Sequence, residues 1–180
     1  MSTITVRDAR PDDAPAVAAI YNHFIRETVI TFEEVELSPG EMQRRMETHS
    51  GEWVVGLDRD EVVGYAYAAP WKARSAYRFS VEITVYVKPG LGRRGIGGRL
   101  YGTLFPRLEA RGTHAILAGI ALPNEASVAL HERFGMKKVA HFEQTGFKFG
   151  KWIDVGYWQW LASSGRVSPS ERDGAPTGER

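Results

Sequence analysis

The sequence predicts an α/β fold in which a mixed β-sheet of about seven strands is flanked by about four helices. Three observations predict it. Residues 80–87 alternate between apolar and polar side chains, residues 100–108 repeat apolar side chains at helical spacing, and residues 115–122 are apolar almost throughout. A strand, a helix and a strand of this kind form a βαβ unit with parallel strands. A hairpin pattern before this unit and two strand patterns after it make the sheet mixed.

The first elements are a short strand and two helices. Ile4 and Val6 suggest the strand, and residues 11–13 give an acidic helix start. The helix that follows carries an apolar stripe of Val17, Ile20, Tyr21 and Phe24. Residues 38–41 mark a second helix start, and this short helix runs towards His49.

The sheet continues as a hairpin and a central strand. Residues 52–57 and 62–68 flank a charged turn, and Pro70 ends the second strand. In residues 80–87 the alternation predicts one face turned to the core. That face consists of Val81, Ile83, Val85 and Val87.

A long helix follows the central strand. Its apolar side consists of Leu100, Tyr101, Leu104, Phe105 and Leu108. Pro106 lacks a backbone donor and collides with the preceding turn, so it predicts a kink within residues 102–106. The apolar run at 115–122 then predicts a strand that is covered on both faces.

Further elements complete a single domain over residues 1–162. Asn124 caps a short helix that closes at Gly135, and two last strands are expected over residues 139–147 and 152–161. Residues 163–180 hold only two apolar side chains, too few to offset the entropy of ordering. We therefore expect a disordered C-terminal tail.

The composition excludes several classes of protein. A chain of 180 residues can bury about 70% of the surface of its unfolded form, so it needs no disulfide or structural metal to hold a core. The absence of cysteine excludes zinc and iron–sulfur sites built from four cysteines, and a net charge of +1 gives no general attraction for nucleic acid or an acidic membrane. No apolar run reaches the roughly 20 residues that a spanning helix needs, and no signal-peptide layout is present. We expect a cytoplasmic protein without metal, nucleic-acid or membrane partners.

A basic, glycine-rich turn, Gly92-Arg93-Arg94-Gly95-Ile96-Gly97-Gly98, opens directly onto the long helix. Glycines let consecutive amides approach phosphate oxygens, and the helix dipole adds attraction for an anion. The alternative is a plain strand-to-helix turn with exposed arginines. A P-loop is excluded because Gly-Lys-Ser/Thr is missing, and a dinucleotide-binding loop because no carboxylate ends the next strand.

These features together resemble the GNAT superfamily of N-acetyltransferases over roughly residues 4 to 162. The resemblance rests on Val85-Tyr86-Val87-x-Pro89, then Arg94-Gly95-Ile96-Gly97, then Asn124 to Met136. Three blocks are most similar to the phosphinothricin and methionine-sulfone or methionine-sulfoximine acetyltransferases. They are Val81-Glu82-x-Thr84-Val85-Tyr86-Val87, Leu122-Pro123-Asn124 and Lys148-x-Gly150-x-Trp152-x-Asp154-Val155-Gly156. The superfamily usually has Gln or Arg where this chain has Gly92, so one pyrophosphate contact would be either rearranged or supplied by Arg93 instead.

The resemblance implies acetyl-CoA as co-substrate and assigns residues to it. The pyrophosphate would lie on Arg93, Arg94, Gly95, Ile96, Gly97 and Gly98. The pantetheine arm would follow Thr84, Val85, Tyr86 and Val87, where the two parallel strands splay apart. Asn124 and Ser127 would touch the arm from the other side, although each can also serve only to cap the helix.

Two side chains are candidates for proton transfer. Glu82 shares the polar strand face with Thr84 and could accept the proton of the amine; its alternative role is that of a solvated strand residue. His131 lies on the helical face of Asn124 and Ser127, where the superfamily commonly carries a Tyr that protonates the departing thiolate. A histidine can relay a proton there, but a lone histidine is also often a packing residue.

The amine substrate is expected beside a segment that mixes cations and aromatics. The candidates in it are Arg74, Ser75, Ala76, Tyr77 and Arg78. Arg74 or Arg78 could clamp a carboxylate, while Phe32 and Tyr77 could wall an apolar or sulfone-like side chain. The alternative is an ordinary loop with solvated arginines.

The sequence thus predicts direct acetyl transfer to the α-amine of a small amino acid or analogue, since no cysteine and no Gly-x-Ser-x-Gly elbow offers a covalent route. Two alternatives stay open: transfer to another amine, such as a polyamine, aminoglycoside or protein N-terminus, and a non-catalytic acyl-CoA-binding module. The last strand is apolar on both faces, with Trp152, Trp158 and Trp160 on one of them, and this predicts a homodimer.

Overall fold

A computed structural model describes residues 4–48 and 52–162. The strands are β1 (Ile4–Asp8), β2 (Trp53–Asp58), β3 (Glu61–Pro70), β4 (Ser80–Val87), β5 (Ala115–Leu122), β6 (Lys137–Lys148) and β7 (Lys151–Leu161). The helices are α1 (Ala14–Glu27), α2 (Pro39–Thr48), α3 (Ile96–Ala110) and α4 (Glu125–Arg133), with short 3-10 turns η1 (Pro11–Asp13) and η2 (Ser75–Tyr77). The predicted tail over residues 163–180 and the end of the second helix at His49 lie outside the described residues.

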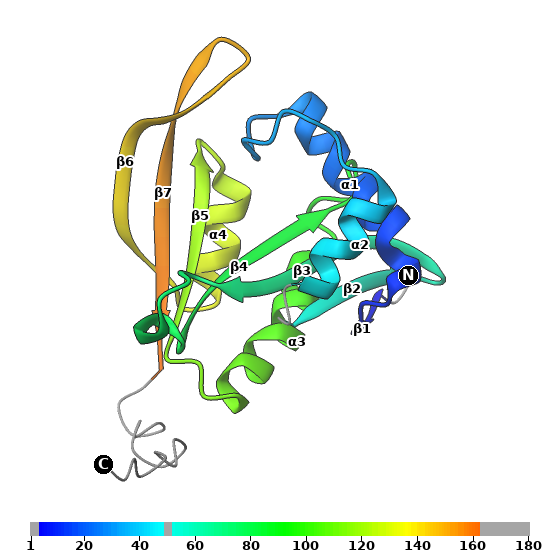
Figure 1. Ribbon diagram of the computed structural model, residues 1–180, viewed down its shortest axis with the longest axis horizontal. Coiled ribbons are helices and arrows are strands. Elements are labelled where there is room, and N and C mark those ends of the chain that lie inside the picture. The colour runs from blue at the N-terminus through cyan, green and yellow to red at the C-terminus, as the bar shows by residue number, and fades with distance from the viewer. Residues whose placement is uncertain (1–3, 49–51, 163–180) are drawn as a thin grey trace, which may run out of the picture.

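The strands form one sheet in the order β1-β2-β3-β4-β5-β7-β6 (Figure 1). The pairing of β4 with β5 is parallel, and the other neighbouring pairs in this sheet are antiparallel. The α/β fold with a mixed seven-stranded sheet and four α-helices is confirmed. Strand β7 returns between β5 and β6, so the last two strands extend the sheet as a hairpin.

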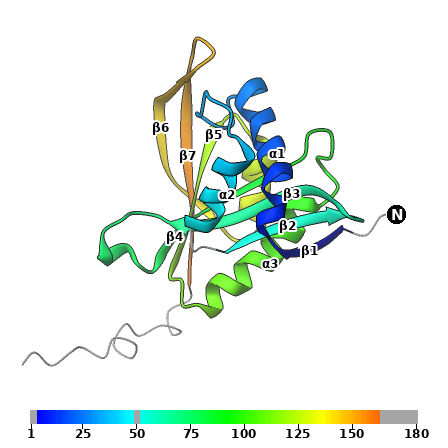
Figure 2. The same cartoon turned by 45° about the vertical axis from the view of Figure 1, so that its right-hand side comes forward.

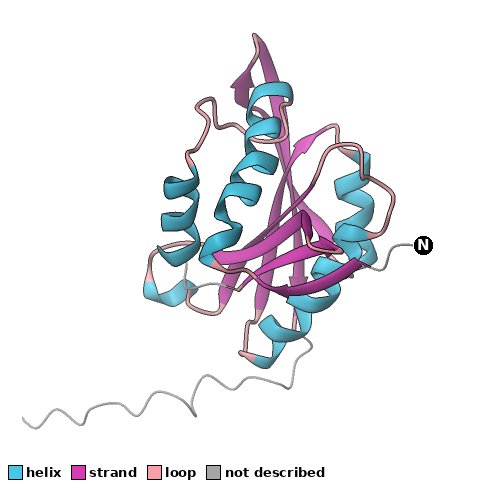
Figure 3. Cartoon of the chain, turned by 90° about the vertical axis from the view of Figure 1, so that its right-hand side faces the viewer, coloured by secondary structure: helices cyan, strands magenta, loops and turns pink. Residues whose placement is uncertain are grey.

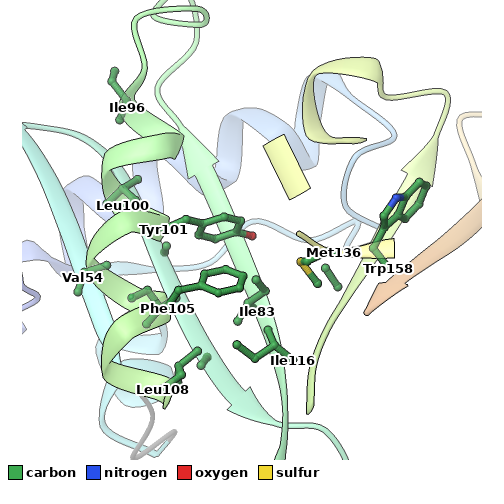
Figure 4. Packing of buried hydrophobic residues seen from close by; sticks show 14 of the residues in the cluster. Val54, Ile83, Ile96, Leu100, Tyr101, Phe105, Leu108, Ile116, Met136 and Trp158 are labelled. Carbon is green, nitrogen blue, oxygen red and sulfur yellow. The ribbon is translucent and has the colours of Figure 1, made fainter. Parts of the chain in front are cut away.

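Helices cover both faces of the sheet (Figure 3), and each face has its own core. On one face, α3 lays Leu100, Tyr101 and Phe105 over the sheet beside Ile83 (Figure 4). This helix continues without interruption through Pro106. Its apolar side is the one that the helical spacing predicts.

On the other face, α1 and α2 pack against aromatic side chains. Tyr86 belongs to the polar set of the predicted alternation in β4, yet its ring lies 5.2 Å from that of Tyr21 and 4.9 Å from that of Phe24. The set on the opposite face packs on the main core as predicted, with Ile83 buried. Strand β4 is therefore covered on both sides, and its polar face lies under α1.

The one parallel pairing in the described sheet is short. Ser80 to Glu82 pair with Ala115 to Leu117, and no pairing between β4 and β5 follows. Strand β3 still pairs with β4 as far as Val87, so the edge of β4 that faces β5 carries unpaired backbone groups beyond Glu82. The two strands separate at the place where the sequence predicts the pantetheine arm.

The β6–β7 hairpin projects beyond the rest of the sheet (Figure 1). The three tryptophans on one face of β7 have different fates: Trp158 is buried, Trp160 is partly buried against the main core and Trp152 is 61% exposed. Trp158 therefore needs no partner copy to cover it, because the core of the same chain does so. The large apolar side chains that stay exposed on the hairpin are Val139, Phe142, Phe147, Phe149, Trp152 and Leu161.

Candidate functional site

A cavity of about 100 Å³ lies where β4 and β5 part. Among the predicted site residues, it is lined by Thr84, Val85, Tyr86, Asn124, Ser127 and His131. Ile83, Gly119, Ile120 and Ala121 of the two strands complete its walls together with Ile30 and Tyr101. The structure therefore brings most of the predicted pantetheine-binding residues and His131 into one cleft, whereas Glu82 lies outside its lining, next to Ile83. Val87 lies beyond the lining, at the end of β4.

The glycine-rich turn lies at the start of α3. The N-cap Gly95 has a φ of 76°, in the left-handed region that favours glycine. A Cβ on Gly97 would lie 2.9 Å from the side chain of Leu130, so glycine there lets α3 approach α4 closely. The first turn of α3 points N–H groups without helical acceptors out of the helix end. The turn thus has the backbone geometry of an anion site.

The two arginines of the turn have different surroundings. The guanidinium of Arg94 donates to Asp58 at the end of β2, with a distance of 3.1 Å between Nη2 and Oδ2. Arg93 is exposed, with a positive φ of 63°. The Arg94 side chain is therefore already paired with a carboxylate, and Arg93 is the better placed of the two to meet a phosphate.

Glu82 lies at the last position at which β4 pairs with β5, next to the start of the cleft. The hydroxyl of Tyr157 and the backbone N–H of Gly119 donate hydrogen bonds to its carboxylate. Burial raises the pKa of Glu82 above its usual value, against the opposing effects of these hydrogen bonds and of the charge of Lys72. A Cβ on Gly119 would lie 3.3 Å from the Glu82 carboxylate, so the glycine leaves room for it. Glu82 is a partly buried, hydrogen-bonded base candidate.

His131 is buried, with 3% of its surface exposed. Its Nδ1 lies 2.7 Å from the carbonyl oxygen of Ser127, which can only accept, so Nδ1 carries the proton. Nε2 then accepts from the hydroxyl of Tyr101 at 2.9 Å. Burial lowers the pKa of His131, which keeps the imidazole neutral near pH 7. Both ring nitrogens are thus engaged, and Tyr101 stands beside His131 in the lining of the cleft.

The predicted substrate residues do not form one patch. Phe32 lies on the connection between α1 and α2, with its ring against Gly146 of β6. Residues Arg74 to Arg78 are exposed on the connection between β3 and β4, next to the start of β5, where the His114 N–H donates to the Phe79 carbonyl. In Figure 1 these two connections lie towards opposite ends of β5. Lys72 is the cation of this segment whose charge acts on Glu82.

Several residues of the cleft escaped sequence reasoning. Tyr101 belongs to the apolar stripe of its helix. Its hydroxyl, which needs a hydrogen-bond partner when it is buried, is the one sequence feature that indicates a polar role. Tyr157 is one of several aromatic residues in the last strand, and nothing local distinguishes it. Ile30 and Gly119 reach the cleft through tertiary contacts alone.

The structure offers no metal centre and no membrane span in the part of the chain that it describes. No three His, Asp or Glu side chains gather there in a way that could hold a metal ion. Among the helices within residues 4–48 and 52–162, none has the length and apolarity to cross a bilayer.

Comparison with known proteins places this geometry in a family. The model of the acetyltransferase (GNAT) domain matches residues 6–156. Phosphinothricin N-acetyltransferase of Streptomyces coelicolor is 41% identical over 162 residues, which cover 87% of this chain and 95% of the relative. L-methionine sulfoximine/L-methionine sulfone acetyltransferase of Pseudomonas aeruginosa is 32% identical over 169 residues, 92% of this chain and 98% of the relative.

A solved structure of a similar acetyltransferase has the same fold as this chain. The GNAT superfamily phosphinothricin acetyltransferase of Sinorhizobium meliloti, in complex with acetyl-CoA, superposes with a TM-score of 0.89 at 36% identity, covering 96% of this chain and 95% of the other. The predicted resemblance is confirmed: the chain belongs to the GNAT family of acetyltransferases.

Proposed function

We propose that this acetyltransferase transfers the acetyl group of acetyl-CoA directly to the α-amine of a small amino acid or analogue of the phosphinothricin, methionine sulfone or methionine sulfoximine type. The observation that carries the proposal is the position of Glu82, a hydrogen-bonded carboxylate at the point where β4 and β5 part. The names of the relatives support the substrate class.

In this proposal the cofactor runs along the edge of β4. The amides of residues 93 to 98 and the Arg93 side chain hold its pyrophosphate at the start of α3. The pantetheine arm lies on the backbone of residues 84–87, and Asn124 and Ser127 contact the arm from the side of α4. A backbone amide near Val85 polarises the thioester carbonyl. The splayed β4–β5 edge supports this path because its backbone groups have no strand partner.

The chemical step needs a neutral amine. A free α-amine has a pKa of about 7.7 to 8.0, so most of it is protonated at pH 7. In our proposal Glu82 takes the proton of the amine, directly or through a water, as the nitrogen bonds to the acetyl carbon and the carbon–sulfur bond breaks. The thiolate then takes the proton of the Tyr101 hydroxyl, which leaves its hydrogen bond to Nε2 of His131 for the sulfur, and solvent returns a proton to Tyr101 while Glu82 releases the one it took. The hydroxyl of Tyr101 is the group there that faces the cleft, and His131 holds its orientation.

Cationic amines such as polyamines and aminoglycosides are a less favoured class of substrate. They call for carboxylates that lack cationic partners, and the acidic run near the acceptor side is Glu33-Glu34-x-Glu36. Arg45 donates to both oxygens of Glu33, at 2.6 and 3.1 Å, and Arg26 pairs with Glu36. Two of the three carboxylates are therefore already neutralised, which supports an amino-acid acceptor.

A panel assay tests the proposal. The purified protein is incubated with acetyl-CoA and, separately, with phosphinothricin, methionine sulfone, methionine sulfoximine, ordinary amino acids and polyamines, while free thiol is measured. We expect thiol release with the sulfone, sulfoximine or phosphinothricin and N-acetylated product by mass spectrometry. Release with polyamines alone would overturn the substrate class. Binding of acetyl-CoA without release for any amine would indicate a non-catalytic binding module.

We also propose that the protein is a cytoplasmic homodimer. The exposed apolar side chains of the β6–β7 hairpin support a second copy of the chain as the partner, because large exposed patches commonly mark such contacts. Sedimentation of the wild type and of Trp152→Glu tests this. We expect a dimer that the variant weakens, whereas a monomeric wild type at micromolar concentration would contradict it.

A further inference from the structure

Lys148, the last residue of β6, has a buried side chain that the proposed reaction does not use. It is 1% exposed, and its Nζ donates to the backbone carbonyl of Thr31 at 2.7 Å. Lysine is almost never buried to this degree unless its ammonium has a partner. Burial lowers the pKa of Lys148, and the charges of Glu34 and Glu33 oppose that shift. The ammonium thus joins the β6–β7 hairpin to a segment more than 100 residues earlier in the chain.

The segment that Lys148 holds forms part of the cleft. Thr31 is 8% exposed, and its hydroxyl lies 2.8 Å from the hydroxyl of Tyr21 on α1. The preceding residue, Ile30, lines the cavity between β4 and β5. The following residue, Phe32, lies against Gly146 of β6. One buried carbonyl therefore lies between Ile30, whose side chain lines the cleft, and Phe32, whose ring lies against β6.

The contact of Phe32 with the hairpin depends on the absence of a side chain at Gly146. A Cβ built on Gly146 would overlap three carbons of the Phe32 ring. Strand β6 thus contacts the α1–α2 connection at two positions. The ammonium of Lys148 donates a hydrogen bond to it, and the backbone at Gly146 packs against the Phe32 ring. Figures 1 and 2 show this connection beside the β6–β7 hairpin in both views.

We propose that Lys148 is a positioning residue for the amine acceptor, which it serves by holding Ile30 and Phe32 in the wall of the acceptor site through the carbonyl of Thr31. This inference rests on the proposed function, because it concerns the acceptor of that same reaction. Lys148 touches neither the cavity between β4 and β5 nor the glycine-rich turn. The residues assigned to acetyl-CoA belong to β4, the glycine-rich turn and α4, none of which Lys148 contacts through a hydrogen bond. Its loss is therefore expected to act mainly on acceptor binding, with a much smaller effect on acetyl-CoA binding.

The variant Lys148→Met tests the proposal, because it removes the ammonium and keeps an unbranched apolar side chain. Lys151→Met is the matched control: Lys151 faces Lys148 in the hairpin register and is exposed. For Lys148→Met we expect the KM of the acceptor to rise roughly tenfold or more, the scale of losing a hydrogen bond to a charged group. The KM of acetyl-CoA should stay within about twofold, and Lys151→Met should match the wild type.

A second variant keeps the proposal testable if Lys148→Met does not fold. Gly146→Ala displaces the Phe32 ring and leaves the ammonium in place, so it should raise the acceptor KM selectively as well. In a Phe32→Ala background, the effect of Lys148→Met on acceptor KM should shrink, since part of it acts through that ring.

The outcomes separate the two proposals. An acceptor KM that is unchanged in Lys148→Met and Gly146→Ala, with an active wild type, would overturn the role of Lys148 and leave the proposed function standing. Equal rises in both KM values would indicate general damage to the fold and would also overturn it. A wild type that acetylates no amine would refute the proposed function itself.

Discussion

Replacing Glu82 with Gln tests the proposed base while changing the cleft little. The amide oxygen of Gln can still accept from Tyr157 or from the N–H of Gly119, so the shape of the site and its hydrogen bonds are largely kept. The ability to take a proton is lost. A positioned general base contributes about 10²- to 10⁴-fold, equivalent to about 3 to 5 kcal/mol of transition-state stabilisation. We therefore expect kcat/KM at neutral pH to fall by a factor in this range.

The pH profile gives the sharper form of this prediction. In the wild type, kcat/KM should fall as the pH drops through the raised pKa of Glu82, because only the carboxylate accepts a proton. Protonation of the amine, with a pKa of about 7.7 to 8.0, adds its own fall. In Glu82→Gln the decrease in kcat/KM caused by protonation of Glu82 should disappear, and the decrease caused by protonation of the amine should remain. The assay is thiol release under subsaturating amine at a series of pH values.

Folding and cofactor binding serve as controls for this variant. Because the folded-state pKa of Glu82 lies above the unfolded value, the fold favours the protonated form, and its ionisation lowers stability as the pH rises through that pKa. The Tm of Glu82→Gln at pH 7 should thus equal or exceed that of the wild type. The Kd of acetyl-CoA should be unchanged. A kcat/KM within about threefold of the wild type, with both controls met, would remove Glu82 from the proton transfer.

Three further variants test other parts of the account. Tyr101→Phe should lower kcat and also lower the free energy of unfolding by about 1 to 3 kcal/mol, because it leaves Nε2 of buried His131 without a donor. Steady-state kinetics measures the first effect and urea titration the second. Wild-type values for both would contradict this prediction. Gly97→Ala should weaken acetyl-CoA binding in calorimetry by pushing α3 away from α4, and an unchanged Kd would count against the turn as the pyrophosphate site. Asp13→Asn should lower the Tm at pH 7, because Arg7 holds the pKa of that carboxyl below its usual 3.8. The difference in Tm between the variant and the wild type should shrink as the pH falls below 3.8 and the carboxyl becomes protonated. A difference in Tm that does not depend on pH would be evidence against the ion pair.

Local patterns were enough to predict the architecture of the central unit. The alternation in β4, the helical spacing of α3 and the apolar run of β5 predict a βαβ unit, and the two strands of that unit part at the carboxyl side of their short parallel pairing. The β4 pattern contains Glu82, and the spacing from Asn124 and Ser127 points to His131, which lines the cleft. The position of β7 between β5 and β6 could not be predicted from the sequence. Both strand patterns carry apolar side chains, so either strand could pair with β5.

The acceptor side depended on tertiary contacts that no local pattern encodes. Arg74 and Arg78 stand out in the sequence, yet their segment lies towards the other end of β5 from Phe32. Lys148 lies between the two predicted last strands and belongs to one of the blocks that resemble the family, but no local pattern predicts that it is buried. In the structure its partner is a backbone carbonyl rather than a carboxylate. Backbone partners leave no complementary residue type for sequence reasoning to find.

The most direct test of the central claim is a crystal structure of the protein with CoA and an N-acetylated amino acid bound. We expect the thiol sulfur between β4 and β5, beside the hydroxyl of Tyr101, and the acetylated nitrogen within hydrogen-bond reach of Glu82 or of a water bound to it. A sulfur outside this cleft, or a product nitrogen remote from Glu82, would contradict the account.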